Sequence, residues 1–207
     1  KIKYQTTNNF SELVVDYLNK NEKLQPFINH FPSLENLEKQ IVEKEKHKVN
    51  RSVLVKVLKE QNSSIILSKN SNENIEFLLD KNTFTITTGH QLCLFTGPLY
   101  FIYKIISSIN LVEQLKDKYP EKNFVPIFWM ASEDHDFEEV NYINLFGRKI
   151  SWESKQDGAV GRMKLNGFQN VLDDLKQILG ESENAQNLIQ LFENAYLNHN
   201  NLSEASR

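Results

Sequence analysis

The chain has 207 residues, of which 40% are hydrophobic and 25% charged, and its formal net charge at pH 7 is −3. This composition is typical of a globular protein with a substantial core, and it gives no electrostatic reason to expect nucleic acid or a membrane surface as a partner. One cysteine excludes an internal disulfide framework, and neither a membrane-spanning run nor a signal-peptide pattern is present, so we expect a cytoplasmic protein.

Residues 1–82 are predicted to form an N-terminal helical region. Apolar residues recur at helical spacing, and the first two runs follow serine, asparagine or proline residues that suit a helix start. The predicted helical segments are 10–18, 33–48, 51–61 and 71–81. Residues 65–67 are expected to form either a short strand or an extended connector.

The apolar pattern changes at Thr83. Alternation with threonine predicts a strand from there, and the apolar run 124–130 predicts a second strand. Between them, residues 99–118 predict an amphipathic helix, whose apolar face comprises Leu99, Ile102, Ile105, Ile106, Ile109 and Val112. We place Pro126 near the start of that strand, because proline fits a central strand poorly. A strand–helix–strand unit of this kind predicts an α/β fold with a parallel sheet, whose strands open at their carboxyl ends onto a common crevice.

Beyond residue 140 the pattern is less regular. Residues 142–152 predict one or two strands, 157–161 a turn, and 168–179 and 185–197 two helices. The chain has only 7 glycines, and residues 202–207 look like the beginning of another helix. We therefore expect the chain to be a fragment of a longer protein.

A first polar cluster, Thr88-Gly89-His90-Gln91, follows the first predicted strand. Glycine at this point permits a positive φ and a close approach of the backbone to a ligand. His90 and Gln91 add donors and acceptors, and histidine can change its charge near neutral pH. The alternative is a turn whose polar groups only cap the next segment.

A second polar cluster, Glu133-Asp134-His135-Asp136, follows the second predicted strand and continues into Glu138-Glu139. Carboxylates at this density repel one another unless a cation compensates. They indicate either a divalent metal or recognition of a substrate amine. The alternative is an acidic helix N-terminus capped by Ser132.

Three further residues could line the same crevice. Gly97 closes the loop before the predicted helix, and Lys104 could either reach a phosphate or carboxylate or extend to solvent. Trp129 is expected in the core or in a pocket wall. Cys93 has apolar neighbours and is interpreted as a buried structural thiol. The sequence contains no dinucleotide or P-loop fingerprint, and it leaves the need for a metal undefined.

Three blocks of this sequence resemble the cysteine ligase family of bacillithiol biosynthesis, the bacillithiol cysteine-adding enzymes. The first block comprises TGHQ at 88–91, LFTGPLY at 94–100 and Tyr103-Lys104. The second is FWMASEDHDFEEV at 128–140, and the third is GAVGRM at 158–163. Their order and spacing match the family, and the N-terminal helices resemble the version found in Bacteroidetes-type bacteria.

The resemblance implies a Rossmann-like core as in class I aminoacyl-tRNA synthetases, interrupted by connecting regions and followed by a helical coiled coil. Residues 83–150 would be the first half of the core, and 151–207 the truncated beginning of a connecting region. A homodimer would form through the coiled coil outside this chain. The implied reaction joins the carboxyl of L-cysteine to the amine of glucosaminyl-malate, and by analogy with other cysteine ligases ATP would activate the carboxylate.

On this basis we hypothesise that the first cluster positions a carboxylate or acyl group, while the second engages amines or acts as a general base. The candidate catalytic residues are His90, Glu133, Asp134, His135 and Asp136. The candidate substrate-binding residues are Thr88, Gly89, Gln91, Gly97, Lys104 and Trp129. Two alternatives are a class I-like nucleotide-binding transferase with another acceptor and a non-catalytic scaffold or metal-binding module.

Overall fold

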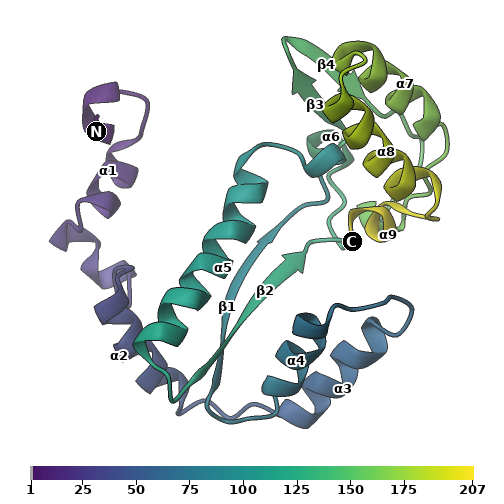
Figure 1. Ribbon diagram of the computed structural model, residues 1–207. Coiled ribbons are helices and arrows are strands. Elements are labelled where there is room, and N and C mark those ends of the chain that lie inside the picture. The colour runs from purple at the N-terminus through teal and green to yellow at the C-terminus, as the bar shows by residue number, and fades with distance from the viewer. Residues whose placement is uncertain (1) are drawn as a thin grey trace. The chain divides into compact units, whose positions relative to one another are not determined.

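The computed structural model describes residues 2–207 (Figure 1). By its internal contacts the described chain divides into two compact units. Unit 1 comprises residues 2–84 and 120–123, and unit 2 comprises residues 85–119 and 124–207. Within these residues no helix is both long and apolar enough to cross a membrane.

Unit 1 is built from helices. They are η1 (Tyr4–Thr7), α1 (Glu12–Leu18), η2 (Glu22–Phe27), α2 (Leu34–Lys44), α3 (Arg51–Gln61) and α4 (Lys69–Phe77), where η denotes a 3-10 helix. Each of the four α-helices begins after a serine or asparagine whose side chain accepts a hydrogen bond from a backbone N–H of the first turn. Residues 65–67 were expected to form either a short strand or an extended connector. They form a connector, because the structure has no strand there.

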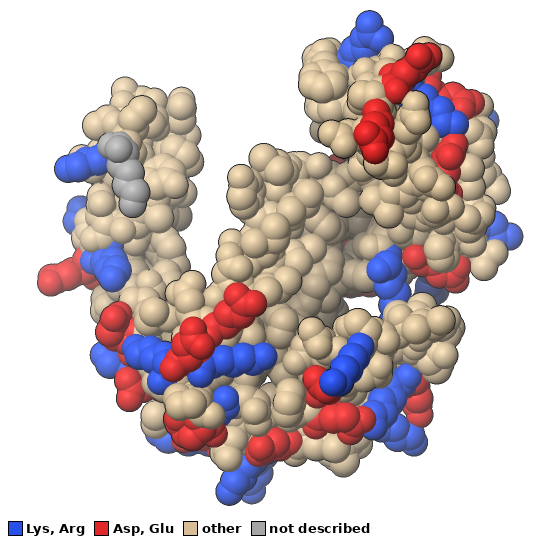
Figure 2. All heavy atoms as spheres, viewed as in Figure 1, with Lys and Arg blue, Asp and Glu red and all other residues tan. Residues whose placement is uncertain are grey.

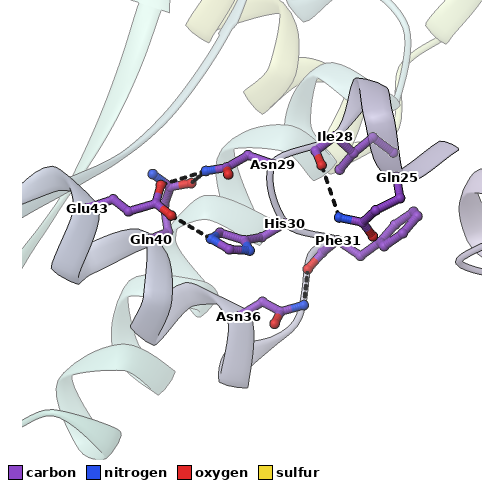
Figure 3. A network of polar contacts seen from close by, with 8 residues as sticks. All are labelled: Gln25, Ile28, Asn29, His30, Phe31, Asn36, Gln40 and Glu43. Carbon is purple, nitrogen blue, oxygen red and sulfur yellow. Dashed lines mark hydrogen bonds and ion pairs between the residues drawn. The ribbon is translucent and has the colours of Figure 1, made fainter. Parts of the chain in front are cut away.

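Side chains also fix how the segments of unit 1 lie. In Figure 3, Asn29 and His30 both point toward Glu43 on α2, with the Glu43 carboxylate 2.7 Å from Asn29 Nδ2 and 2.9 Å from His30 Nε2. These bonds, led by the one from Asn29, lower the pKa of Glu43. Elsewhere, the Arg51 guanidinium donates to the carbonyl oxygens of Leu78 and Thr83, which ties the start of α3 to the chain entering the sheet.

Strands β1 (Thr83–His90) and β2 (Asn123–Met130) pair in parallel, with α5 (Tyr100–Lys118) as the crossover (Figure 1). The N–H of Asn123 donates to Asn82 O at 3.0 Å, and the N–H of Ala131 donates to His90 O at 3.1 Å. The offset of 41 residues is the same at both ends, as a parallel ladder requires. The predicted α/β fold with a parallel sheet is confirmed.

Pro126 lies in the middle of β2 and not near its start, so that expectation was wrong. The N–H groups of Asn123 and Ala131 point toward β1, and N–H directions alternate along a strand. The nitrogen of Pro126 therefore points away from β1. Proline at this position removes no hydrogen bond from the β1–β2 ladder.

The buried face of α5 differs from the predicted one. Leu99, Ile102, Ile106 and Ile109 are exposed, whereas Val112 and Leu115 are buried. Figure 2 shows the surface over the N-terminal half of α5 without charged side chains. Because this helix is apolar around much of its circumference, periodicity alone did not select the stripe that packs against the sheet.

The rest of unit 2 forms a separate layer of strands and helices around one hydrophobic core. Its elements are η3 (Leu94–Thr96), α6 (Phe137–Val140), the antiparallel strands β3 (Tyr142–Leu145) and β4 (Arg148–Ser151), η4 (Val160–Arg162), α7 (Phe168–Leu179), α8 (Glu183–Leu197) and α9 (Leu202–Ser206). Trp152, Phe168 and Tyr196 form the aromatic centre of this core, where the rings of Phe168 and Tyr196 stack 4.2 Å apart. The region predicted as one or two strands is thus a hairpin.

Candidate functional site

The two polar clusters meet at the carboxyl ends of β1 and β2. Gln91 directly follows β1, and its side-chain amide donates to Asp134 Oδ2 and to Glu139 Oε2, each at 2.8 Å. Asp134 lies in the turn after β2, and Glu139 lies on α6. Two carboxylates from different segments are thus held by one amide at the edge of the sheet, where open α/β folds bind ligands.

Asp134 is held in its ionised form. Its Oδ1 accepts a hydrogen bond from the backbone N–H of Asp136 at 3.0 Å. That bond, followed by the one from Gln91, lowers the pKa of Asp134 below its ordinary value. A carboxylate stabilised in this way suits recognition of an ammonium group better than uptake of a proton.

The acidic cluster is a turn and not the start of a helix. Residues 131–136 have no helical structure, and α6 begins only at Phe137, with Asp136 preceding it. Ser132 therefore does not cap α6, and the capping alternative fails for residues 133–136. Only the second part of that alternative, acidic residues in the first turn of a helix, applies to Glu138 and Glu139, because they lie at the start of α6, where the helix dipole favours negative charge.

Glu133, His135 and Asp136 are exposed on this turn. Among residues 2–207 no side-chain hydrogen bond is formed by any of the three. They face solvent beside the ionised Asp134, so they are accessible to a ligand bound there. The structure does not bring His135 together with His90.

The third sequence block, which carried no predicted site residue, holds the acidic turn in place. The N–H of Val160 donates to Asp134 O at 2.7 Å, and that of Gly161 donates to Ser132 O at 3.0 Å. A Cβ added to Gly161 would lie 2.6 Å from the Cβ of Ser132. Only glycine permits this approach, and the contact spans too many residues for local sequence patterns to reveal it.

Gly89 is required for a different reason from the predicted one. Its φ is not positive. A Cβ on Gly89 would instead lie 2.8 Å from the carbonyl oxygen of Trp129 and 2.9 Å from its Cβ, so glycine permits close pairing of the strand ends. The argument from positive φ applies to Gly97, whose φ is +57° and whose added Cβ would collide with Cys93. Trp129 itself is 60% exposed and is therefore not a core residue.

His90 is the centre of a second polar group on the α5 side of β1. Its Nε2 lies 3.1 Å from the hydroxyl of Tyr100, and its Nδ1 lies 3.1 Å from Gln91 O and 3.6 Å from the sulfur of Cys93. Burial, followed by the charge of Glu139, raises the pKa of the Cys93 thiol. Cys93 is therefore a buried neutral thiol, in agreement with the structural role predicted for it.

Lys104 turns back toward the strand and does not extend into solvent. Its ammonium donates to the carbonyl oxygen of Gly89. Thr88, one residue earlier on β1, lines the same groove as Lys104. The structure thus brings Thr88, Gly89, His90, Gln91 and Lys104 together at the end of β1. Within residues 2–207 no three histidine, cysteine or acidic side chains are grouped so that they could hold a metal ion.

Comparison with known proteins places these features in a family. The family model for bacillithiol biosynthesis BshC, N-terminal Rossmann-like domain, matches residues 1–207. A protein of Flavobacterium johnsoniae named "Putative cysteine ligase BshC" is 53% identical over 208 residues, which cover all of this chain and 39% of that protein. Relatives of the same name from Flavobacterium psychrophilum and Christiangramia forsetii are 50% and 49% identical, again over 100% of this chain and 39% of their own length. The chain therefore belongs to the BshC family of bacillithiol biosynthesis, as its N-terminal Rossmann-like domain.

Proposed function

We propose that the protein containing this domain joins the carboxyl group of L-cysteine to the amine of glucosaminyl-malate. Membership of the BshC family supports the pathway, and the names of the relatives support a ligase. The observation that carries the proposal is the amide of Gln91 held between the carboxylates of Asp134 and Glu139. The two carboxylates that this amide positions would form an anionic site for an amine at the end of the sheet.

In this proposal the acidic turn receives the ammonium form of the acceptor. Asp134, whose pKa is lowered, stays ionised and pairs with the positive charge. An amine must be neutral to attack a carboxyl carbon, so a neighbouring base has to take its proton. His135 and Glu133 are exposed on the same turn and are the candidates for this step.

The cysteine carboxylate must be activated before the amide forms. The amine nitrogen then attacks the activated carboxyl carbon, the C–N bond forms, and the activating group leaves with its electron pair. We assign the positioning of this acyl group to His90 and Gly89, which lie beside the acidic turn at the end of β1. ATP is the proposed activator by analogy with other cysteine ligases, and no residue of this domain is assigned to it.

We also propose a reducing, cytoplasmic setting for the reaction. The substrate L-cysteine carries a thiol that must stay reduced, and the domain contains a buried free thiol at Cys93. Localisation of the tagged full-length protein by cell fractionation tests this part.

Incubation of the full-length protein with cysteine and glucosaminyl-malate, with and without ATP, tests the reaction. We expect bacillithiol, identified by mass spectrometry of the labelled thiol, and its loss when either substrate is omitted. Cells lacking the gene should accumulate glucosaminyl-malate and lack bacillithiol. Transfer of cysteine to a different acceptor, but not to glucosaminyl-malate, would favour the class I-like transferase. A protein with no ligation activity that still binds malate-like ligands or metal would favour the scaffold alternative.

A further inference from the structure

The imidazole of His90, the last residue of β1, is held at both of its ring nitrogens. Its Nδ1 lies 3.1 Å from the carbonyl oxygen of Gln91, and its Nε2 lies 3.1 Å from the hydroxyl of Tyr100. Tyr100 is the first residue of α5, and it is 54% exposed. One partner of the ring is thus a backbone group and the other is a side chain from the next element.

The backbone partner determines which nitrogen of neutral His90 carries the proton. A carbonyl oxygen can only accept a hydrogen bond, so Nδ1 must be protonated to donate to Gln91 O. A neutral imidazole has one N–H, so Nε2 is then an acceptor and the Tyr100 hydroxyl is its donor. The sulfur of Cys93, 3.6 Å from Nδ1, does not change this, because a thiol is a weak donor and a weak acceptor.

The orientation of the His90 ring is fixed by the same contacts. A rotation of the ring by half a turn would place carbon atoms where the two nitrogens now lie, and both hydrogen bonds would be lost. The ring also packs against two aromatic rings of α5, with its centroid 5.2 Å from that of Tyr100 and 5.5 Å from that of Phe101. The backbone of His90 is held as well, because its carbonyl oxygen accepts from the N–H of Ala131 at 3.1 Å.

The loop between β1 and α5 brings Tyr100 back to His90. After β1 the chain passes through η3 and returns to the start of α5 (Figure 1). Phe95 and Thr96 in this loop have φ values of +49° and +69°, a conformation that side chains of their kind adopt only where other contacts impose it. The N–H of Phe95 donates to the Tyr196 hydroxyl in the core at 2.9 Å. The core of unit 2 therefore supports the loop conformation that places Tyr100 against His90.

We propose that Tyr100 is a positioning residue, whose hydroxyl fixes the orientation of the His90 imidazole and keeps its proton on Nδ1. Resting on the proposed function, this is the orientation in which His90 positions the acyl group of cysteine. Tyr100 acts through His90 and not by contact with a substrate. Its hydroxyl therefore affects the use of cysteine and not the binding of the acceptor amine, which the acidic turn receives.

Nitrogen-15 NMR of the full-length protein, labelled in its histidines, reports the position of the proton without any turnover. The signals that disappear in His90→Ala are those of His90. In alkaline buffer, where histidine is ordinarily neutral, we expect a protonated Nδ1 and an unprotonated Nε2 in the wild type. Tyr100→Phe keeps the aromatic ring and removes the hydroxyl, so part of the population should move its proton to Nε2. A wild-type proton on Nε2, or identical spectra of Tyr100→Phe and the wild type, overturns the proposal.

Kinetics of the full-length protein report the consequence for the reaction. Tyr100→Phe should lower kcat/KM for cysteine about three- to tenfold, the factor that corresponds to one neutral hydrogen bond, and leave KM for glucosaminyl-malate unchanged. Tyr142→Phe on β3 is the matched control, because the Tyr142 ring lies 4.1 Å from Lys149 Nζ and its hydroxyl has no hydrogen bond within residues 2–207. It should match the wild type in kinetics and in the histidine spectrum. A lower KM for cysteine in Tyr100→Phe would show that the hydroxyl competes with the substrate for His90, and the proposal would be wrong.

A double-mutant cycle separates positioning from direct contact with a substrate. If Tyr100 acts through His90, Tyr100→Phe should cause no further loss of kcat/KM in a His90→Ala background. An undiminished loss in that background would make Tyr100 a substrate contact and overturn the proposal. Circular dichroism establishes that the single and double variants are folded. If the wild-type protein forms no bacillithiol, the proposed function fails, and the NMR spectra still decide whether Tyr100 fixes His90.

Discussion

The side-chain amide of Gln91 lies 2.8 Å from Asp134 Oδ2, which joins the residue after β1 to the turn after β2. The second proton of the same amide is donated to Glu139. Neutral amide donors thus separate two carboxylates that would otherwise repel each other. Gln91 thus positions the two carboxylates, while the N–H groups of Val160 and Gly161 hold the backbone of the acidic turn.

Gln91→Ala should therefore disturb the acidic turn without unfolding the protein. Removal of the amide takes away one of the two main causes that lower the pKa of Asp134, so this pKa should rise. We expect kcat/KM for bacillithiol formation to fall roughly ten- to hundredfold through misplaced carboxylates. Carboxyl NMR titration reports the pKa, and steady-state kinetics report the activity.

The matched control is Gln169→Ala on α7, where the glutamine also donates to an aspartate, Asp173, at 2.9 Å. That pair is exposed and distant in sequence from the site, and its loss should leave kcat/KM unchanged. Equal activity of Gln91→Ala and the wild type would remove Gln91 from the site.

Asp134→Asn tests the need for a charged group in the acidic turn. The amide retains the size of the side chain but cannot pair with an ammonium, so we expect kcat/KM to fall roughly a hundredfold or more. Because the pKa of Asp134 is lowered, the activity that depends on its charge should persist below the ordinary pKa of aspartate and disappear only as the pH falls through the lowered value.

His135→Ala should cause a comparable loss if the imidazole takes the proton of the amine. Asp174→Asn on α7 is the control, since this exposed aspartate lies on the outer face of a helix. Unchanged far-UV circular dichroism establishes that the variants are folded. Full activity of both Asp134→Asn and His135→Ala would show that the chemistry does not take place at the acidic turn.

Gly161→Ala should strain the contact between η4 and the acidic turn. The new Cβ would lie 2.6 Å from Ser132 Cβ and 2.8 Å from Ser132 O. Overpacking of this kind costs about 1–3 kcal/mol of unfolding free energy, which thermal denaturation can measure. Ser132→Gly in the same chain removes one of the two clashes and should restore part of the stability. A stability equal to that of the wild type would contradict the close contact.

Tyr196→Phe should destabilise the core of unit 2. The Tyr196 hydroxyl accepts a hydrogen bond from the N–H of Phe95 at 2.9 Å, and its removal leaves that buried donor unsatisfied. The expected cost is about 1–3 kcal/mol, measured by denaturant unfolding. Tyr17→Phe is the control, because Tyr17 is exposed on α1 and its hydroxyl has no such partner among the described residues.

The same tyrosine predicts a loss of stability in alkali. Burial raises the pKa of Tyr196 to about 12, whereas an unfolded tyrosine titrates near 10. The stabilisation from the neutral Tyr196 hydroxyl is complete below pH 10, the pKa of the unfolded state. It falls by about 2–3 kcal/mol as the pH rises to the pKa of the folded state. Tyr196→Phe should show a weaker decrease of stability between pH 10 and 12. An identical decrease in both proteins would assign it to other groups.

The helices and strands were largely predictable because their causes are local. Arg51 to Gln61 was predicted as a helix with the bounds that α3 has, because its apolar residues recur at helical spacing. The structure adds the cap, which Asn50 supplies. The strands β1 and β2 followed from their β-branched and apolar runs. The buried face of α5 was not predictable, because Ile102 and Ile106 are as apolar as the residues that the sheet covers.

By itself, the sequence determined the parallel strand–helix–strand unit, the two polar clusters at its strand ends and the blocks that resemble the BshC family. Only the tertiary structure decided which side chains meet. Gln91 reaches Glu139 across 48 positions of sequence, and Gly161 contacts Ser132 from a separate turn. Hydrophobic periodicity and composition indicate which local backbone conformation each segment prefers. These contacts instead depend on how segments distant in sequence pack against one another.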